Sequence, residues 1–140
     1  MHLPPPSAQS FLDGARRYIT AACILIDARA AVDAIGLVAS HGLELALKAF
    51  LLQAGRTPDE LRKRFGHDLD KLWSEAVRGG LPVERDPPYW LAVLSFMHDG
   101  PRYLYRYPTE GVASAIPAAD TLGETLRNVF SVVETAVRET

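Results

Sequence analysis

The chain has 140 residues, of which 48% are hydrophobic and 23% are charged, and its formal net charge is −2 at pH 7. This composition is typical of a globular domain and excludes an intrinsically disordered chain. The slight negative charge argues against a generic nucleic-acid coat protein, which carries a strong basic excess, so any phosphate binding must be local. The length predicts a single domain over residues 1–140.

The first residues and the single cysteine bear on where the protein works. MHLPPPS lacks a basic segment leading into a long apolar stretch, and no run in the chain reaches the roughly 18 uninterrupted apolar residues that span a bilayer. Cys23 is the only cysteine, so no disulfide can form within the chain, and we expect a buried thiol. These features predict a soluble, cytoplasmic protein without membrane contact.

The predicted helices begin after an extended tail. Three prolines hold residues 1–6 extended, and the Ser7 hydroxyl can accept hydrogen bonds from the free amides of a first helix. Apolar residues then recur at spacings of four and three, which predicts one long amphipathic helix to about residue 34. We expect Gly36 to loosen the junction with a second helix, and Gly55 to stop that helix just past its last residue.

The second helix is apolar on almost every side, which predicts the central helix of a bundle. Its one polar stripe consists of His41, Glu44 and Lys48, at spacings of three and four. We predict an ion pair between Glu44 and Lys48 across one helical turn, with His41 satisfied nearby. The alternative is that these three side chains line a subunit interface or a ligand site.

The rest of the chain also follows a helical pattern. Thr57 and Glu60 form a capping box for a short helix through about residue 64, and a fourth helix begins near residue 67 or 68. A fifth helix follows two prolines and stops near residue 99, residues 99–117 form an irregular loop, and a last helix covers about residues 118–138. No segment alternates with period two. The predicted fold is all-α, an up-and-down bundle of four long helices plus one or two short ones.

Motifs of the common enzyme classes are absent from the sequence. It has no Gly-rich phosphate loop, dinucleotide fingerprint, HExxH motif, paired cysteines or nucleophile elbow. The four histidines lie far apart and without the spacing of metal ligands, so we expect no metal site and no cofactor. They are His2, His41, His67 and His98.

One basic cluster lies between the two short helices and comprises Arg62, Lys63, Arg64 and His67. The free amides at the start of the following helix would attract an anion such as a phosphate. His67 could take the proton from a 2′-hydroxyl of RNA while Arg62 stabilises the charge of the transition state, because imidazole titrates near neutral pH. The alternative is that His67 caps the helix and the basic residues only solvate a turn.

A second cluster is the segment RYLYRYP, residues 102–108, in which tyrosines alternate with arginines. Aromatic rings interleaved with guanidinium groups can stack nucleobases and hold phosphates, which makes Arg102, Arg106 and Tyr107 candidate ligand-binding residues. The alternative is a loop that docks its tyrosines on the bundle and caps helix ends with its arginines.

Taken in order, ELALKAFLLQAG, HDLDKL and RYP ahead of a final amphipathic helix, the chain resembles the HEPN domain family over about residues 11–137. It is similar to the branch in which a Glu and a Lys on the second helix precede an HDL turn. The matching positions are Glu44, Lys48, Gly55, His67, Asp68, Leu69, Arg106, Tyr107 and Pro108.

The resemblance implies an up-and-down helical bundle, commonly a homodimer. The family includes metal-independent ribonucleases of toxin–antitoxin and antiphage systems, and non-catalytic modules that bind nucleotides or partners, often beside a nucleotidyltransferase. The ribonuclease branch carries an Arg usually followed by Asn, Asp or His, whereas Lys63 follows Arg62 here. We therefore expect a nucleotide- or RNA-binding or interaction module without efficient catalysis. The alternatives are a ribonuclease using Arg62 and His67, and a subunit paired with a nucleotidyltransferase.

Overall fold

The computed structural model describes residues 3–107 and 109–139. Within those residues it contains six α-helices and no strand, which confirms the all-α prediction. Three helices have 20 to 22 residues and three have 7 to 11. In chain order they are α1 (Ala8–Asp27), α2 (Val32–Gln53), α3 (Pro58–Arg64), α4 (Leu69–Arg78), α5 (Tyr89–Asp99) and α6 (Ala119–Arg138).

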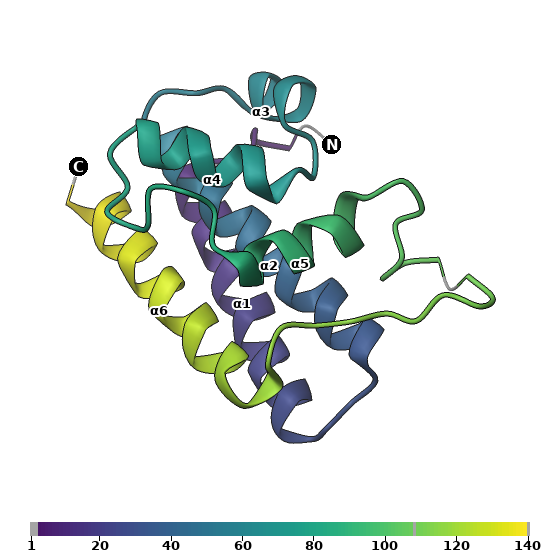
Figure 1. Cartoon of the computed structure of the whole chain (residues 1–140). Helices are drawn as coiled ribbons and strands as arrows, with labels where there is room; N and C mark the ends of the chain where they lie inside the picture. Colours follow the sequence, from purple (N-terminus) through teal and green to yellow (C-terminus); the bar gives the residue numbers. More distant parts are fainter. Residues whose placement is uncertain (1–2, 108, 140) are drawn as a thin grey trace.

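Helix α2 is the central element, as its apolar sequence predicts. It packs against α1, α4, α5 and α6, and the three long helices lie side by side in Figure 1. By length and composition α2 could cross a membrane, but 67% of its 18-residue apolar window is buried inside the protein. Burial of that extent is the environment of a core helix, because its apolar side chains already contact other helices rather than a surrounding medium.

The boundary between the first two helices lies earlier than the sequence suggested. Helix α1 ends at Asp27 and α2 begins at Val32, so Gly36 lies inside α2 rather than at a junction. Arg29 adopts a left-handed conformation with φ of 54°, and the amide of Ala30 donates to the carbonyl of Leu25 at 3.0 Å. This bonding pattern ends a helix, but the left-handed residue is usually glycine, so an arginine at this position did not indicate a helix end.

The other end of α2 follows the prediction. Gly55 has φ of 105°, and the amide of Arg56 donates to the carbonyl of Leu51 at 3.0 Å. Glycine accepts this left-handed conformation without a steric penalty, which is why the helix stops here.

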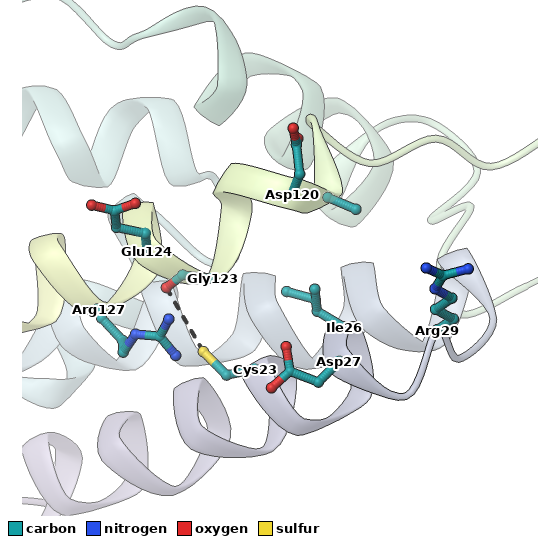
Figure 2. A pocket seen from close by; sticks show the side chains of 9 residues that line it. Cys23, Ile26, Asp27, Arg29, Asp120, Gly123, Glu124 and Arg127 are labelled. Atoms are coloured by element: carbon teal, nitrogen blue, oxygen red, sulfur yellow. Dashed lines mark hydrogen bonds between the residues drawn. The ribbon is translucent and has the colours of Figure 1, made fainter.

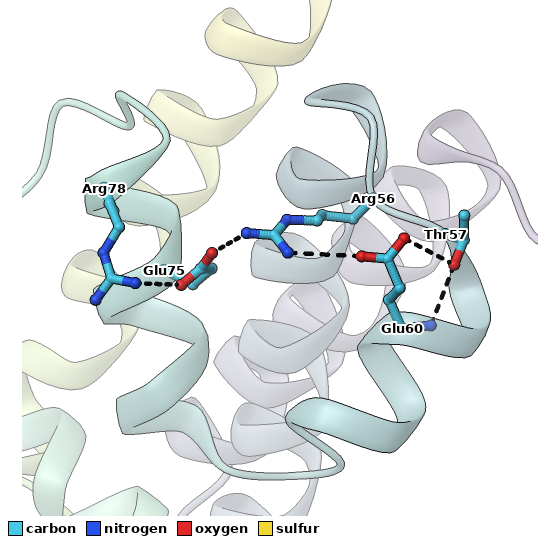
Figure 3. A network of polar contacts seen from close by, with 5 residues as sticks. All are labelled: Arg56, Thr57, Glu60, Glu75 and Arg78. Carbon is cyan, nitrogen blue, oxygen red and sulfur yellow. Dashed lines mark hydrogen bonds and ion pairs between the residues drawn. The ribbon is translucent and has the colours of Figure 1, made fainter.

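The short helices are held by their caps and by an ion-pair network. The Thr57 hydroxyl accepts from the Glu60 amide at 3.1 Å, so Thr57 caps α3 as predicted, while Glu60 accepts from the Thr57 hydroxyl rather than from its amide as a full capping box requires. Figure 3 shows that the guanidinium of Arg56 bridges Glu60 on α3 and Glu75 on α4, and that Glu75 also pairs with Arg78. This network fixes α3 and α4 relative to the end of α2.

The segment between α5 and α6 has no helix in its described residues and extends away from the bundle in Figure 1. It is anchored by Tyr105, whose side chain is only 4% exposed and whose hydroxyl donates to the carbonyl of Ala115 at 2.6 Å. The Tyr105 ring lies against α2 at Gly36, where a β-carbon would come within 2.2 Å of it. Glycine is therefore required at position 36 for this contact.

Candidate functional site

The carboxylate of Glu44 is the centre of the most extensive buried polar cluster described in the structure. Its side chain is 4% exposed, and its Oε1 accepts hydrogen bonds from Nδ1 of His67 at 2.8 Å and from Nε2 of His98 at 3.0 Å. Lys48 donates to the second oxygen, Oε2, at 3.1 Å, which confirms the predicted pair across one turn of α2. We call Glu44, Lys48, His67 and His98 the Glu44 cluster.

Three separate elements contribute to the Glu44 cluster. Glu44 and Lys48 lie on one side of the central helix, and His98 lies in the last turn of α5, 54 residues further along than Glu44. His67 lies in the turn between α3 and α4, where the Asp68 side chain caps α4 by accepting from the Lys71 amide at 3.1 Å. His67 itself is therefore not the cap, and its ring is free to bond to Glu44.

The electrostatics keep Glu44 ionised. Burial alone would raise the pKa of this carboxyl group, but the hydrogen bond from His98, the charge of Lys48 and the hydrogen bond from His67 outweigh it and lower the pKa to about 2. A buried carboxylate is stable only with such partners, since its desolvation costs several kcal/mol. Glu44 thus acts as a fixed negative charge inside the bundle.

The two histidines differ in their access to solvent. The His67 side chain is 44% exposed, whereas that of His98 is 1% exposed, and their rings meet edge to face with centroids 5.6 Å apart. Because Glu44 engages Nδ1 of His67, the Nε2 atom remains without a hydrogen bond among the described residues. His67 is thus a held imidazole with one accessible nitrogen, which can bind an anion or transfer a proton.

The third member of the predicted polar stripe, His41, lies apart from the hydrogen bonds of the Glu44 cluster. Its ring packs edge-on against Tyr18 at 4.5 Å, and its Nδ1 is buried without a hydrogen-bond partner among the described residues. Burial lowers the pKa of His41; Glu44 opposes this effect, and His98, Arg106 and His67 add to it. Arg106 of the exposed loop therefore lies within electrostatic range of His41.

Acidic side chains lie beside the histidines. Burial raises the pKa of Asp99, and the charge of Asp68 raises it further, while His67 and His98 lower it. Burial and the charge of Asp68 likewise raise the pKa of Asp70. The surroundings of the Glu44 cluster are therefore of mixed charge rather than uniformly basic.

The basic turn that the sequence singled out is organised differently. Arg62 pairs with Asp59 at 3.1 Å, both side chains are 73% exposed, and no interaction joins Arg62 to His67 in the described part of the chain. The guanidinium of Arg64 lies 5.1 Å from the ring centre of Phe65, and Lys63 is exposed. At the start of α4 the Lys71 amide is already bound by the Asp68 carboxylate, whose negative charge opposes an anion there.

The segment of residues 102–107 has features of both interpretations given above, an exposed ligand-binding segment and a loop docked on the bundle. Tyr105 docks on the bundle, whereas Arg102, Tyr103, Arg106 and Tyr107 are exposed. The rings of Tyr103 and Tyr107 lie edge to face with centroids 6.4 Å apart. Pro108, the last residue of the motif, and His2 lie outside the described residues.

A separate hollow lies between α1 and the start of α6 (Figure 2). This pocket of about 450 Å³ is bordered by Cys23, Asp27, Arg29, Asp120 and other residues of the two helices. Cys23 is buried, as expected, and its thiol donates to the carbonyl of Gly123 at 3.7 Å. The pocket contains no member of the Glu44 cluster.

The sequence predicted the pair of Glu44 with Lys48 and singled out His67, but it did not connect His67 to that pair and assigned no role to His98. No protein-family model matches the chain, and neither a curated protein nor a solved structure matches it. Membership of the HEPN family stays a prediction that rests on the motifs in the sequence.

Proposed function

We propose that the protein is a HEPN-like up-and-down bundle that binds the phosphate group of a nucleotide or of RNA beside the Glu44 cluster. The observation that supports this proposal is that Glu44 on α2 holds the imidazole of His67 while the loop arginine Arg106 lies within electrostatic range of His41 on the same helix. Because the net charge is −2, the chain as a whole does not attract a polyanion, so phosphate binding depends on a local group of cationic side chains.

The residues supply complementary contacts to a nucleotide. The guanidinium of Arg106 can donate to two phosphate oxygens at once, and Nε2 of His67 can donate to a third when the ring is protonated on both nitrogens. The exposed rings of Tyr103 and Tyr107 offer surfaces for a base to stack on, a contact worth about 1–3 kcal/mol per base. Asp68 and Asp99 dilute the positive field, which favours a single nucleotide or an RNA end over a long polyanion.

Fluorescence anisotropy with labelled mononucleotides and short RNA tests this proposal. Arg106→Ala should weaken binding by about tenfold, which corresponds to the loss of one charge-assisted contact. Arg62→Ala is the matched control, because it removes an equally exposed type of side chain that pairs with Asp59. Equal binding by the Arg106→Ala and wild-type proteins would contradict the proposal, and binding that does not weaken with added salt would contradict the role of phosphate.

Metal-independent RNA cleavage is a second candidate, favoured by one observation. Glu44 holds Nδ1 of His67, which orients the ring as the third group of a hydrolytic triad does. Nε2 would take the proton from a 2′-hydroxyl, the 2′-oxygen would attack phosphorus, and the bond to the 5′-oxygen would break. The products are a 2′,3′-cyclic phosphate and a 5′-hydroxyl once the leaving oxygen receives a proton.

Cleavage is tested by incubating RNA with the purified chain in the presence of a chelator. Activity that disappears in His67→Ala and persists in Arg62→Ala would support this candidate with Arg106 in place of Arg62 as the phosphate-stabilising residue. Activity that persists in a folded His67→Ala variant would exclude it.

A further inference from the structure

We propose that Glu44, His67 and His98 form a binding site for a divalent transition-metal ion such as Zn²⁺. One ligand atom from each residue is available, and these atoms all lie within 4.8 Å of one another. This inference does not rest on the proposed nucleotide binding, because all three ligands come from the chain itself. It revises the expectation of no metal site, which was drawn from the spacing of the histidines in the sequence.

The distances suit a shared cation. Oε1 of Glu44 lies 2.8 Å from Nδ1 of His67 and 3.0 Å from Nε2 of His98. Ligands bound tetrahedrally to zinc at roughly 2.0–2.2 Å stand about 3.4 Å apart. An ion would therefore need the two Glu44–histidine pairs to separate by about 0.4–0.6 Å, and the two histidine nitrogens, which lie within 4.8 Å of each other, to adopt the same spacing.

The donor set indicates the class of metal. Two imidazole nitrogens and one carboxylate oxygen favour zinc, cobalt, nickel or iron(II) over magnesium and calcium, which prefer oxygen ligands. Three protein ligands leave at least one coordination position open. Because Glu44 and His98 are buried and His67 is 44% exposed, that position would be reached from the His67 side.

Metal binding requires a different tautomer of His67 and of His98. For metal binding, the nitrogen of each histidine that now donates to Glu44 must give up its hydrogen, so a neutral ring carries its hydrogen on the other nitrogen. In His67 that atom is Nε2, on the partly exposed side chain. In His98 it is Nδ1, which is buried and has no partner among the described residues, so the change breaks no hydrogen bond there.

The positive charge of Lys48 opposes binding of a metal ion at Glu44, and this opposition can be tested. Its ammonium group lies 3.1 Å from Oε2 of Glu44, so it occupies the second carboxylate oxygen and repels a nearby cation. Glu44 would then bind the metal through Oε1 alone. Removal of the lysine charge by Lys48→Met should strengthen metal binding, whereas no change is expected if the ion binds nonspecifically to exposed side chains far from this buried lysine.

The experiment is titration of the full chain, freed of any histidine tag and of metal, with Zn²⁺ followed by calorimetry and with Co²⁺ followed by visible absorption. We expect one ion per chain and tetrahedral or five-coordinate cobalt bands. His67→Ala should weaken binding by more than about 100-fold, since even loss of an outer-shell partner costs roughly 10–100-fold. Asp13→Ala is the control, because this exposed carboxylate on α1 pairs with Arg16 away from the Glu44 cluster, and it should leave the affinity unchanged.

Circular dichroism on each variant separates loss of the site from loss of the fold. His67→Ala should keep its helical spectrum because Glu44 retains His98 and Lys48 as partners. Absence of a cobalt spectrum in the folded wild-type chain would overturn the proposal, and so would binding that His67→Ala leaves intact. Since no nucleotide is present, neither result depends on whether the proposed nucleotide binding holds.

Discussion

The Glu44 cluster and the basic turn of Arg62, Lys63 and Arg64 are both charged, but they differ in almost every physical respect. Glu44 is 4% exposed and has three hydrogen-bonding partners from three elements. Arg62 is 73% exposed and, among the described residues, pairs only with Asp59 on its own helix. Buried charges interact strongly because water does not screen them, and exposed pairs contribute about 0–1 kcal/mol. In this chain, sparse polar residues on an apolar helix mark the site better than a dense run of charges does.

The largest expected effect comes from neutralising the buried carboxylate. Glu44→Gln should lower the free energy of unfolding by about 3–5 kcal/mol, because it leaves the Lys48 ammonium buried without a counter-charge. Urea denaturation followed by circular dichroism measures this change. The double variant Glu44→Gln with Lys48→Met should recover part of the loss; no recovery would contradict the importance of the pair.

The same carboxylate should give the stability a strong acid dependence. Its pKa is lowered from 4.5 to about 2 in the folded state, so its contribution is complete above about pH 5 and is lost as the pH falls towards 2. The shift corresponds to about 3 kcal/mol. Urea denaturation from pH 7 to pH 2 measures it.

A variant background isolates this acid dependence. Burial also lowers the pKa of His41 from 6.5, so protonation of His41 destabilises the fold as the pH drops below that value. In a His41→Gln background, the decrease in the free energy of unfolding between pH 6.5 and 5 should be smaller. The decrease below pH 5 should remain, because it comes from Glu44. If Glu44→Gln shows the same decrease in the free energy of unfolding below about pH 5 as the wild-type chain, a group other than Glu44 causes the acid dependence.

A steric change at the loop anchor should have an intermediate effect. In Gly36→Ala the new β-carbon would meet the Tyr105 ring, so the free energy of unfolding should fall by about 1–3 kcal/mol. Thermal and urea denaturation measure the loss. In a Tyr105→Ala background the added methyl group has room, and the cost of the alanine should vanish; a cost that persists there would place the clash elsewhere.

The smallest effect is expected at the exposed turn. Arg62→Gln should change the free energy of unfolding by less than about 1 kcal/mol, because the pair with Asp59 is screened by water. The comparison with Glu44→Gln, measured under the same conditions, is the direct test of the contrast between the two regions. Similar losses in both variants would refute it.

Local patterns in the sequence predicted those features that depend on near neighbours. The Thr57 cap of α3, the pair of Glu44 with Lys48 and the stop of α2 at Gly55 each involve residues within one or two turns of helix. The end of α1 was missed because Arg29, not glycine, adopts the left-handed conformation there.

The candidate site was harder to predict, since its members are distant in sequence. His67 and His98 lie 23 and 54 residues from Glu44, and only the packing of α4 and α5 on α2 brings them to one oxygen atom. A lone histidine at the end of an apolar helix, such as His98, carries no periodic pattern that would indicate its partner.

The contact of Tyr105 with the backbone of Gly36 joins the arginine-bearing segment to the bundle at a defined point. A chain fastened in this way gives up its conformational entropy during folding instead of when a ligand arrives. Arg106 is thereby preorganised beside the central helix. One added methyl group at residue 36 would transfer that entropic cost from folding to recognition.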